Sequence, residues 1–282
     1  MPAQTSSREH GFTLIEMLMV IVIIGVIGTM VAVFMRAPVD AYFASARRAA
    51  LSDTADTAMR RMARDLRKAL PNSVRNPGSQ CIEFIPTKTG GRYRAGADSA
   101  GAGDFLDFSA ADTSFNMLGL NSTLPADQQI TVTDVIGVYN LGIPGSDAYT
   151  GINTATVTSV VSGTGTFANE TNIGIASRQF PLPSGGNRFH VIPGNEKIVS
   201  FVCTNGNLYR NANYVYPASI ADPAACPTTG GAVLAKNATC TFVYNGSDLQ
   251  RNGLIQMTLT VSDPASGEAM RLYHEIHVDN SP

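Results

Sequence analysis

Charged side chains are scarce in this sequence, since Asp, Glu, Lys and Arg together make up 15% of its 282 residues. An average soluble domain has about 25%. The formal net charge is only −2, so bulk positive charge does not favour a nucleic acid, and we expect no nucleic-acid partner. The 44% of hydrophobic residues excludes a disordered chain. The lack of a sustained internal period excludes a repeat array.

Glycine and proline are nearly missing from the first quarter of the chain. Of the 26 glycines, 23 lie beyond Leu70, and 13 of the 15 prolines lie at or after Pro71. Because both residues interrupt helices, their distribution divides the chain into a helical first part and a second part rich in turns.

The sequence also lacks the common catalytic and metal-binding patterns. It contains no G-x-S-x-G, Walker A or dinucleotide fingerprint, and its cysteines form no C-x-x-C pair. His274 and His277 have the wrong spacing for H-E-x-x-H, and on a strand they point to opposite faces. Asp98, Asp104 and Asp107 lie in a glycine-rich stretch but lack the spacing of a calcium loop. We therefore expect no catalytic residue, no metal and no cofactor.

A long apolar run near the N-terminus predicts a membrane span. Phe12–Met35 is 24 residues long and contains one charge, Glu16. About 20 apolar residues cross a bilayer as a helix, so we expect a transmembrane helix over residues 12–35. The alternative is a cleaved secretory signal, with Ala44, Ser45 and Ala46 as its small-x-small site. The run is longer than the apolar core of an ordinary signal peptide.

An amphipathic pattern follows the apolar run and predicts that the helix continues over residues 36–70. Apolar residues recur at spacings of three and four on one face: Leu51, Ala55, Ala58, Met62, Leu66 and Ala69. The opposite side is basic: Arg60, Arg61, Arg64, Arg67 and Lys68. Pro71 should end the helix, and Pro38 inside it should produce a kink. A helix over Phe12–Leu70 would be about 88 Å long.

Charge is separated along the chain. Residues 36–75 hold nine Lys/Arg and four Asp, a balance of +5, whereas residues 76–282 have a balance of −6. The basic helix can face anionic lipid or an acidic partner. The alternative is a solvated face covered by the chain's own acidic remainder.

The hexapeptide Gly11-Phe12-Thr13-Leu14-Ile15-Glu16, followed by an apolar stretch, resembles the type IV prepilin processing signal. The resemblance implies that residues 1–11 are a cytoplasmic leader, removed after Gly11 by a prepilin peptidase/methyltransferase. Phe12 would become the N-methylated first residue. Glu16, which is costly in lipid, would pair with the N-terminal amine of a neighbouring subunit.

A second resemblance concerns the helix end and three short segments beyond it. The segments Met59–Arg75, Cys81–Phe84, Val199–Cys203 and Leu208–Arg210 are similar to MshO-like minor pilins of mannose-sensitive haemagglutinin (MSHA) pili. Secretion pseudopilins of the J type and PilW-type minor pilins share the same plan. The resemblance implies a minor pilin that enters the pilus by helix packing and initiates assembly or forms its tip. The alternatives are a tip adhesin with a receptor-binding head and a minor pseudopilin of type II secretion.

The same resemblance implies a location and a set of partners. The chain would be a single-pass protein of the bacterial inner membrane, with its N-terminus cytoplasmic and its head periplasmic, and would then enter the pilus, at the tip. Its partners would be the prepilin peptidase/methyltransferase, other major and minor pilins, the inner-membrane platform of the pilus machine and the lipid bilayer.

Residues 72–282 predict a β-rich head, which makes the fold class α+β with an antiparallel, type IV pilin-like head. Alternation of apolar and polar residues predicts a hairpin of Leu254–Val261 and Met270–Val278. We expect further strands at Cys81–Ile85, Asp104–Phe108, Ile130–Tyr139, Thr154–Val161, Ile198–Cys203 and Cys240–Tyr244.

All four cysteines lie in this head, at Cys81, Cys203, Cys226 and Cys240. An even number beyond a membrane span predicts an oxidising compartment and two disulfides. Four cysteines allow three connectivities, and the sequence does not decide among them. We favour a local Cys226–Cys240 loop together with Cys81–Cys203 between two strands.

Overall fold

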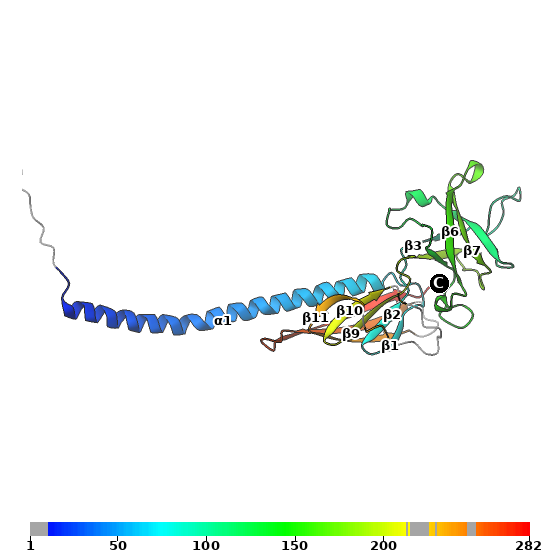
Figure 1. The fold of residues 1–282 in the computed structure, drawn as a ribbon. Helices are drawn as coiled ribbons and strands as arrows, with labels where there is room; N and C mark the ends of the chain where they lie inside the picture. Colours follow the sequence, from blue (N-terminus) through cyan, green and yellow to red (C-terminus); the bar gives the residue numbers. More distant parts are fainter. Residues whose placement is uncertain (1–10, 213, 215–225, 229, 247–251) are drawn as a thin grey trace, which may run out of the picture. The chain divides into compact units, whose positions relative to one another are not determined.

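A computed structural model describes residues 11–212, 214, 226–228, 230–246 and 252–282. The predicted leader, apart from Gly11, lies outside these residues. The chain divides into two compact units, Met1–Ala50 and Leu51–Pro282, and the helix α1 (Leu14–Leu66) contributes to both. One helix, α1, followed by antiparallel sheets confirms the predicted α+β class (Figure 1).

Helix α1 ends four residues before the predicted end at Leu70. The chain leaves the helix because contacts distant in sequence hold the next residues. The N–H of Leu70 donates to the carbonyl of Ile85 at 2.8 Å, Ala69 forms an isolated bridge with Pro86, and the Leu70 side chain is buried. Near its middle, α1 passes through Pro38 without interruption; the kink expected there stays a prediction.

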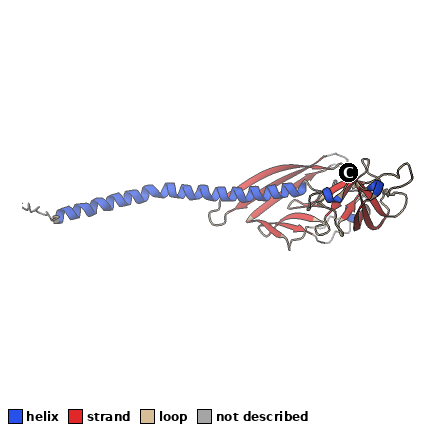
Figure 2. Cartoon of the chain, turned by 90° about the horizontal axis from the view of Figure 1, so that it is seen from above, coloured by secondary structure: helices blue, strands red, loops and turns tan. Residues whose placement is uncertain are grey.

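The last four turns of α1 are buried on one face, as the periodicity predicts. The buried residues of this face are Ala55, Ala58, Met59, Met62, Ala63 and Leu66, and Leu51 and Ala69 pack beside them. They share one apolar core with two antiparallel sheets, and strands lie on both sides of this helix end in Figure 2. Burial of this apolar face holds the helix end against the head.

Two sheets surround that core. The first has five strands in the order β1-β2-β9-β10-β11: Arg75–Gly78, Cys81–Phe84, Val199–Thr204, Asn207–Ala212 and Ala232–Lys236. The second has three strands in the order β12-β13-β14: Ala238–Asn245, Asn252–Ser262 and Ala269–Asp279. Strands β13 and β14 confirm the predicted C-terminal hairpin, and they pair over eleven residues without a register shift.

A second lobe is inserted between β2 and β9. It contains six antiparallel strands, β3 to β8: Thr89–Arg92, Asp112–Leu118, Val135–Gly137, Thr154–Ser162, Glu170–Arg178 and Arg188–Ile192. Three short 3-10 helices connect them: η1 (Asn121–Thr123), η2 (Ala148–Thr150) and η3 (Gly165–Phe167). The sheet order is β3-β8-β5-β6-β7-β4.

The inserted sheet closes on itself. A bridge between Tyr93 and Met117 connects the end of β3 to β4, the two edges of the sheet. Phe115 and Phe189 meet edge to face in the enclosed core, with ring centres 5.3 Å apart. A glycine is needed beside them, because a Cβ on Gly91 would lie 2.8 Å from Cζ of Phe189.

Four of the single strand predictions are confirmed: Cys81–Ile85, Thr154–Val161, Ile198–Cys203 and Cys240–Tyr244 correspond to β2, β6, β9 and β12. Two others are wrong in whole or in part. Asp104–Phe108 forms no strand, and of Ile130–Tyr139 only Val135–Gly137 is extended in a sheet.

The cause of both errors is side-chain hydrogen bonding to the backbone, which competes with strand pairing. Asp134 accepts a hydrogen bond from the N–H of Thr131 at 2.7 Å and closes a turn just before β5. Asp112 likewise accepts from the N–H of Asp107 at 2.9 Å.

The favoured disulfide pairing is wrong, because the structure joins Cys81 to Cys226 and Cys203 to Cys240. In the ladder of β2 and β9, Cys81 lies opposite Val202, so Cys203 points to the other face of the sheet. A bond between Cys81 and Cys203 would have to cross the sheet. Each cysteine therefore bonds to the segment that covers its own face.

We expect peptide mapping of the unreduced protein to recover Cys81 joined to Cys226 and Cys203 joined to Cys240. The second bond closes a loop with a sequence separation of 37. Replacing Cys203 and Cys240 together by Ala should lower the free energy of unfolding by about 4 kcal/mol in the chain-entropy description. Denaturant unfolding of the full chain in detergent measures this change. A recovered Cys81–Cys203 peptide would contradict the assignment.

Candidate functional site

The start of α1 holds the residues of the predicted processing segment. Gly11 and Phe12 are exposed and precede the helix, which begins at Leu14. The hydroxyl of Thr13 accepts a hydrogen bond from the N–H of Glu16 at 3.3 Å. Thr13 is thus the N-cap and Glu16 the third helical residue, the arrangement of a capping box.

Sequence reasoning gave Thr13 no role of its own. The spacing T-x-x-E before an apolar run would have identified it as a cap. The structure therefore gives Glu16 a local role as well, since a carboxylate in the first turn interacts favourably with the helix dipole.

The N-terminal part of α1 is an exposed apolar surface. Every side chain from Leu14 to Met35 is exposed, and α1 is long and apolar enough to cross a membrane. Glu16 is the one ionisable residue in this stretch. An apolar surface of this length has to be covered by lipid or by other apolar helices.

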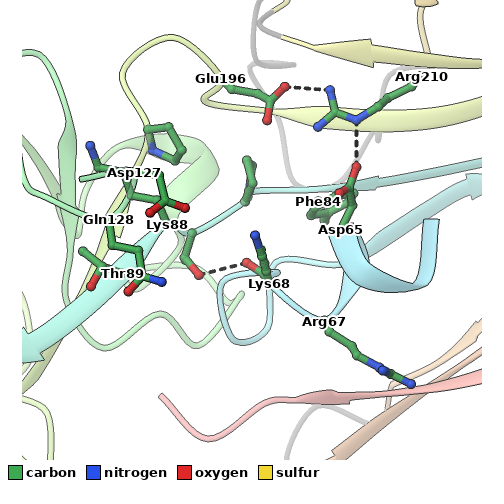
Figure 3. Close-up of a pocket in the computed structure, with 13 residues that line it drawn as sticks. Asp65, Arg67, Lys68, Phe84, Lys88, Thr89, Asp127, Gln128, Glu196 and Arg210 are labelled. Carbon is green, nitrogen blue, oxygen red and sulfur yellow. Dashed lines mark hydrogen bonds and ion pairs between the residues drawn. The ribbon is translucent and has the colours of Figure 1, made fainter. Parts of the chain in front are cut away.

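Arg210 on β10 anchors the other end of α1. Its guanidinium donates to Asp65 of α1 at 2.8 Å and to Glu196, between β8 and β9, at 2.6 Å (Figure 3). The hydrogen bonds with Glu196 and Asp65 raise the pKa of Arg210 further above its usual value. The helix end is thereby tied to two other segments of the head.

A polar pocket of about 380 Å³ lies beside this anchor. Arg67 and Lys68 line it just after the end of α1, and Lys88 and Asp127 line it from the inserted lobe. The Arg67 side chain points away from the other labelled residues (Figure 3). Lys88 already forms an ion pair with the buried Asp134 at 2.6 Å. The lining mixes both signs of charge, so the pocket has no strong preference for an anion or a cation.

The seam between the two lobes contains a buried polar network. Glu83 on β2 is 1% exposed; it forms an ion pair with Arg75 and accepts a hydrogen bond from the Tyr214 hydroxyl. The Arg75 guanidinium lies 3.4 Å from the ring centre of Tyr149 in η2 of the inserted lobe. The Tyr149 hydroxyl donates to the carbonyl of Ser73 at 2.8 Å. Charge and stacking together fix the inserted lobe to β1 and β2.

Burial, with the neighbouring Glu83 carboxylate, raises the pKa of Tyr214 well above its usual value. The hydroxyl therefore stays protonated and acts as a donor throughout the physiological range. The network has the composition of a structural element, in which each charge has a partner.

The acidic residues considered for calcium are occupied by local hydrogen bonds. Asp98 and Asp107 accept from backbone N–H groups of their own loops. Asp104 accepts from Ser114 at 2.6 Å and from Asn172 at 2.8 Å. Over the ranges that the structure describes, there is no group of three or more His, Cys, Asp or Glu that could hold a metal ion.

The two C-terminal histidines are not brought together. His274 lies opposite Met257, and His277 lies opposite Leu254 three residues further along β14. An odd separation on a strand sends the two side chains to opposite faces. The four cysteines of the head are all used in disulfides.

We predict that Glu83→Ala lowers the free energy of unfolding by about 3 kcal/mol, because it leaves the half-buried Arg75 without its carboxylate. The double variant Arg75→Met with Glu83→Leu should lose less than the single one. Glu275→Ala is a matched control, since Glu275 also accepts from a tyrosine but is exposed; it should leave stability nearly unchanged. Denaturant unfolding tests all three, and equal losses for Glu83→Ala and Glu275→Ala would refute a buried network.

Comparison with known proteins finds one match, at the N-terminus. Residues 6–32 match the prokaryotic N-terminal methylation motif. No curated protein and no solved structure matches the chain. The motif, together with the exposed apolar helix, supports a type IV pilin-like or pseudopilin protein that is anchored in a membrane and processed by a prepilin peptidase.

Proposed function

We propose that the chain is a minor pilin of a type IV pilus of the MSHA kind. It is inserted in the inner membrane by α1, cleaved after Gly11, methylated on Phe12 and incorporated by helix packing to initiate assembly or form the tip. The observation that carries the proposal is the methylation motif over residues 6–32, joined to an apolar helix whose side chains are exposed.

Glu16 has a physical reason to act in assembly. A single charge in a helix in lipid costs about 2.5–3.5 kcal/mol near the bilayer centre. The new amino group of Phe12 is cationic, and N-methylation leaves it so. Pairing that amine in one subunit with Glu16 in the next offsets both costs and fixes the axial stagger of the two helices. Apolar contacts alone specify little register, because lipid provides no hydrophobic drive between helices.

In this proposal the helix and the head have different roles in the filament. The apolar part of α1 supplies the filament core, while the disulfide-bonded sheets and the Arg210 anchor keep the head attached to the helix end. The inserted lobe, β3 to β8, supplies outer surface for contacts with other subunits or with a receptor. Type II secretion pseudopilins share this division, so assays of both pili and secretion separate the two machines.

Processing gives the most direct test. N-terminal sequencing and intact mass of the mature protein should yield N-methylphenylalanine at position 12, with residues 1–11 missing. Gly11→Ala, which adds a methyl group beside the scissile bond, serves as the comparison and should accumulate the uncleaved form. A mature chain that starts at Met1 or near Arg47 would refute the proposal.

For Glu16→Val we expect normal membrane insertion but at least tenfold less protein in sheared filaments, because the amine of the neighbouring subunit loses its carboxylate. Glu16→Asp, which keeps the charge, should retain more incorporation than Glu16→Val. Immunoblots of membrane and filament fractions measure both. Normal incorporation of Glu16→Val would reject the pairing role.

A further inference from the structure

A groove runs between α1 and strand β14. It has a volume of about 650 Å³. The buried Met59 and Ala63 contribute to its lining, and Arg60, Arg64 and Arg67 follow one another along its helical side. His274 of β14 lines it from the opposite side. The groove therefore combines an apolar floor with a row of guanidinium groups.

Most of this positive charge is not neutralised by ion pairs among the residues that the structure describes. Arg60 forms an ion pair with Asp56 at 2.8 Å, one turn earlier on the same helix. Arg64 and Arg67 are exposed, and neither forms an ion pair with any residue in the described parts of the chain. Two arginines three residues apart on one side of a groove produce a local positive field that attracts carboxylates.

The other side of the groove offers unpaired backbone. Strand β14 is an edge strand of its sheet within the described residues, paired only to β13. It is eleven residues long, has no proline and pairs with β13 without a bulge. A regular edge of this length presents a row of N–H and C=O groups to which another extended segment can add.

We propose that this groove binds an extended acidic segment of another protein subunit, which adds to the edge of β14 and directs its carboxylates at Arg64 and Arg67. Backbone hydrogen bonds would align the bound segment along β14, and the arginines would favour a segment that carries negative charge. That the partner is a filament subunit rests on the proposed function. That the bound segment is extended and acidic rests only on the groove itself, namely on its arginines and the edge of β14.

Anionic lipid is the competing ligand for the same arginines. In α1, Arg64 is the 29th residue after Met35, the end of the apolar run. This is about 43 Å of helix, several times the Debye length of about 8 Å at physiological salt. The position along the helix thus favours a protein carboxylate over a lipid headgroup.

The test uses the full chain in detergent micelles and a fluorescent eight-residue peptide of alternating threonine and glutamate as the probe. We expect saturable binding that weakens at least tenfold in Arg64→Glu. Arg61→Glu is the matched control, because Arg61 is exposed on the same helix but does not line the groove; it should change binding less than threefold. A peptide with N-methyl groups on alternate amides should lose binding, because it cannot add to the strand.

Three results would overturn the proposal: no saturable binding, equal weakening by Arg61→Glu and Arg64→Glu, or undiminished binding of the N-methylated peptide. Arg64-dependent binding of phosphatidylglycerol vesicles without peptide binding would assign the groove to lipid instead. Because the assay uses purified chain and a synthetic peptide, its outcome is independent of the N-terminal processing that tests the proposed function.

Discussion

The apolar surface of α1 from Leu14 to Met35 is the constraint on which the rest of the molecule depends. Side chains of this size and number are unfavourable in water, and the chain contains nothing in its described parts that covers them. The head must therefore fold and stay folded without help from this part of the helix. Its own core begins only at Leu51, with the first residues of α1 that pack against the sheets.

The head is stabilised independently of the apolar part of α1, by several kinds of contact within the head and with the helix end. Apolar residues on one face of α1 enter the shared core, and Arg210 forms an ion pair with Asp65 of the helix. Two disulfides secure opposite faces of the five-stranded sheet, through Cys81 on one face and Cys203 on the other. The helix end is thus held by packing and by an ion pair, while the disulfides secure the sheets against which it packs.

The sequence predicts those features that depend on local pattern. The buried face of Ala55, Ala58, Met62 and Leu66 follows from the helical period, and the hairpin of β13 and β14 follows from alternation. The sequence does not predict features that depend on contacts between residues far apart in the chain. The helix ends at Leu66 because Leu70 is held by Ile85, a contact that no local pattern encodes.

The disulfides illustrate the same limit. Choosing their partners requires the register of β2 against β9, because a shift by one residue exchanges the faces on which the cysteines lie. Loss of the strand at Asp104–Phe108 has a related cause. The apolar residues of this segment suggested a strand, but Asp107 and Asp112 accept hydrogen bonds from backbone N–H groups in and beside it.

The ion pairs of the folded protein show which of the separated charges along the chain are neutralised. Buried or half-buried acids of the head are paired with cations of the head itself, as in Glu83 with Arg75 and Glu170 with Arg94. The Arg94 hydrogen bond lowers the pKa of Glu170, which keeps that carboxylate ionised. Within the residues that the structure describes, no acid of the head forms an ion pair with the basic side of α1, and Arg210 of the head pairs with Asp65, an acid of the helix. The helix loses negative charge to the head and retains its exposed arginines, so its positive face is more pronounced in the folded protein than the composition suggests.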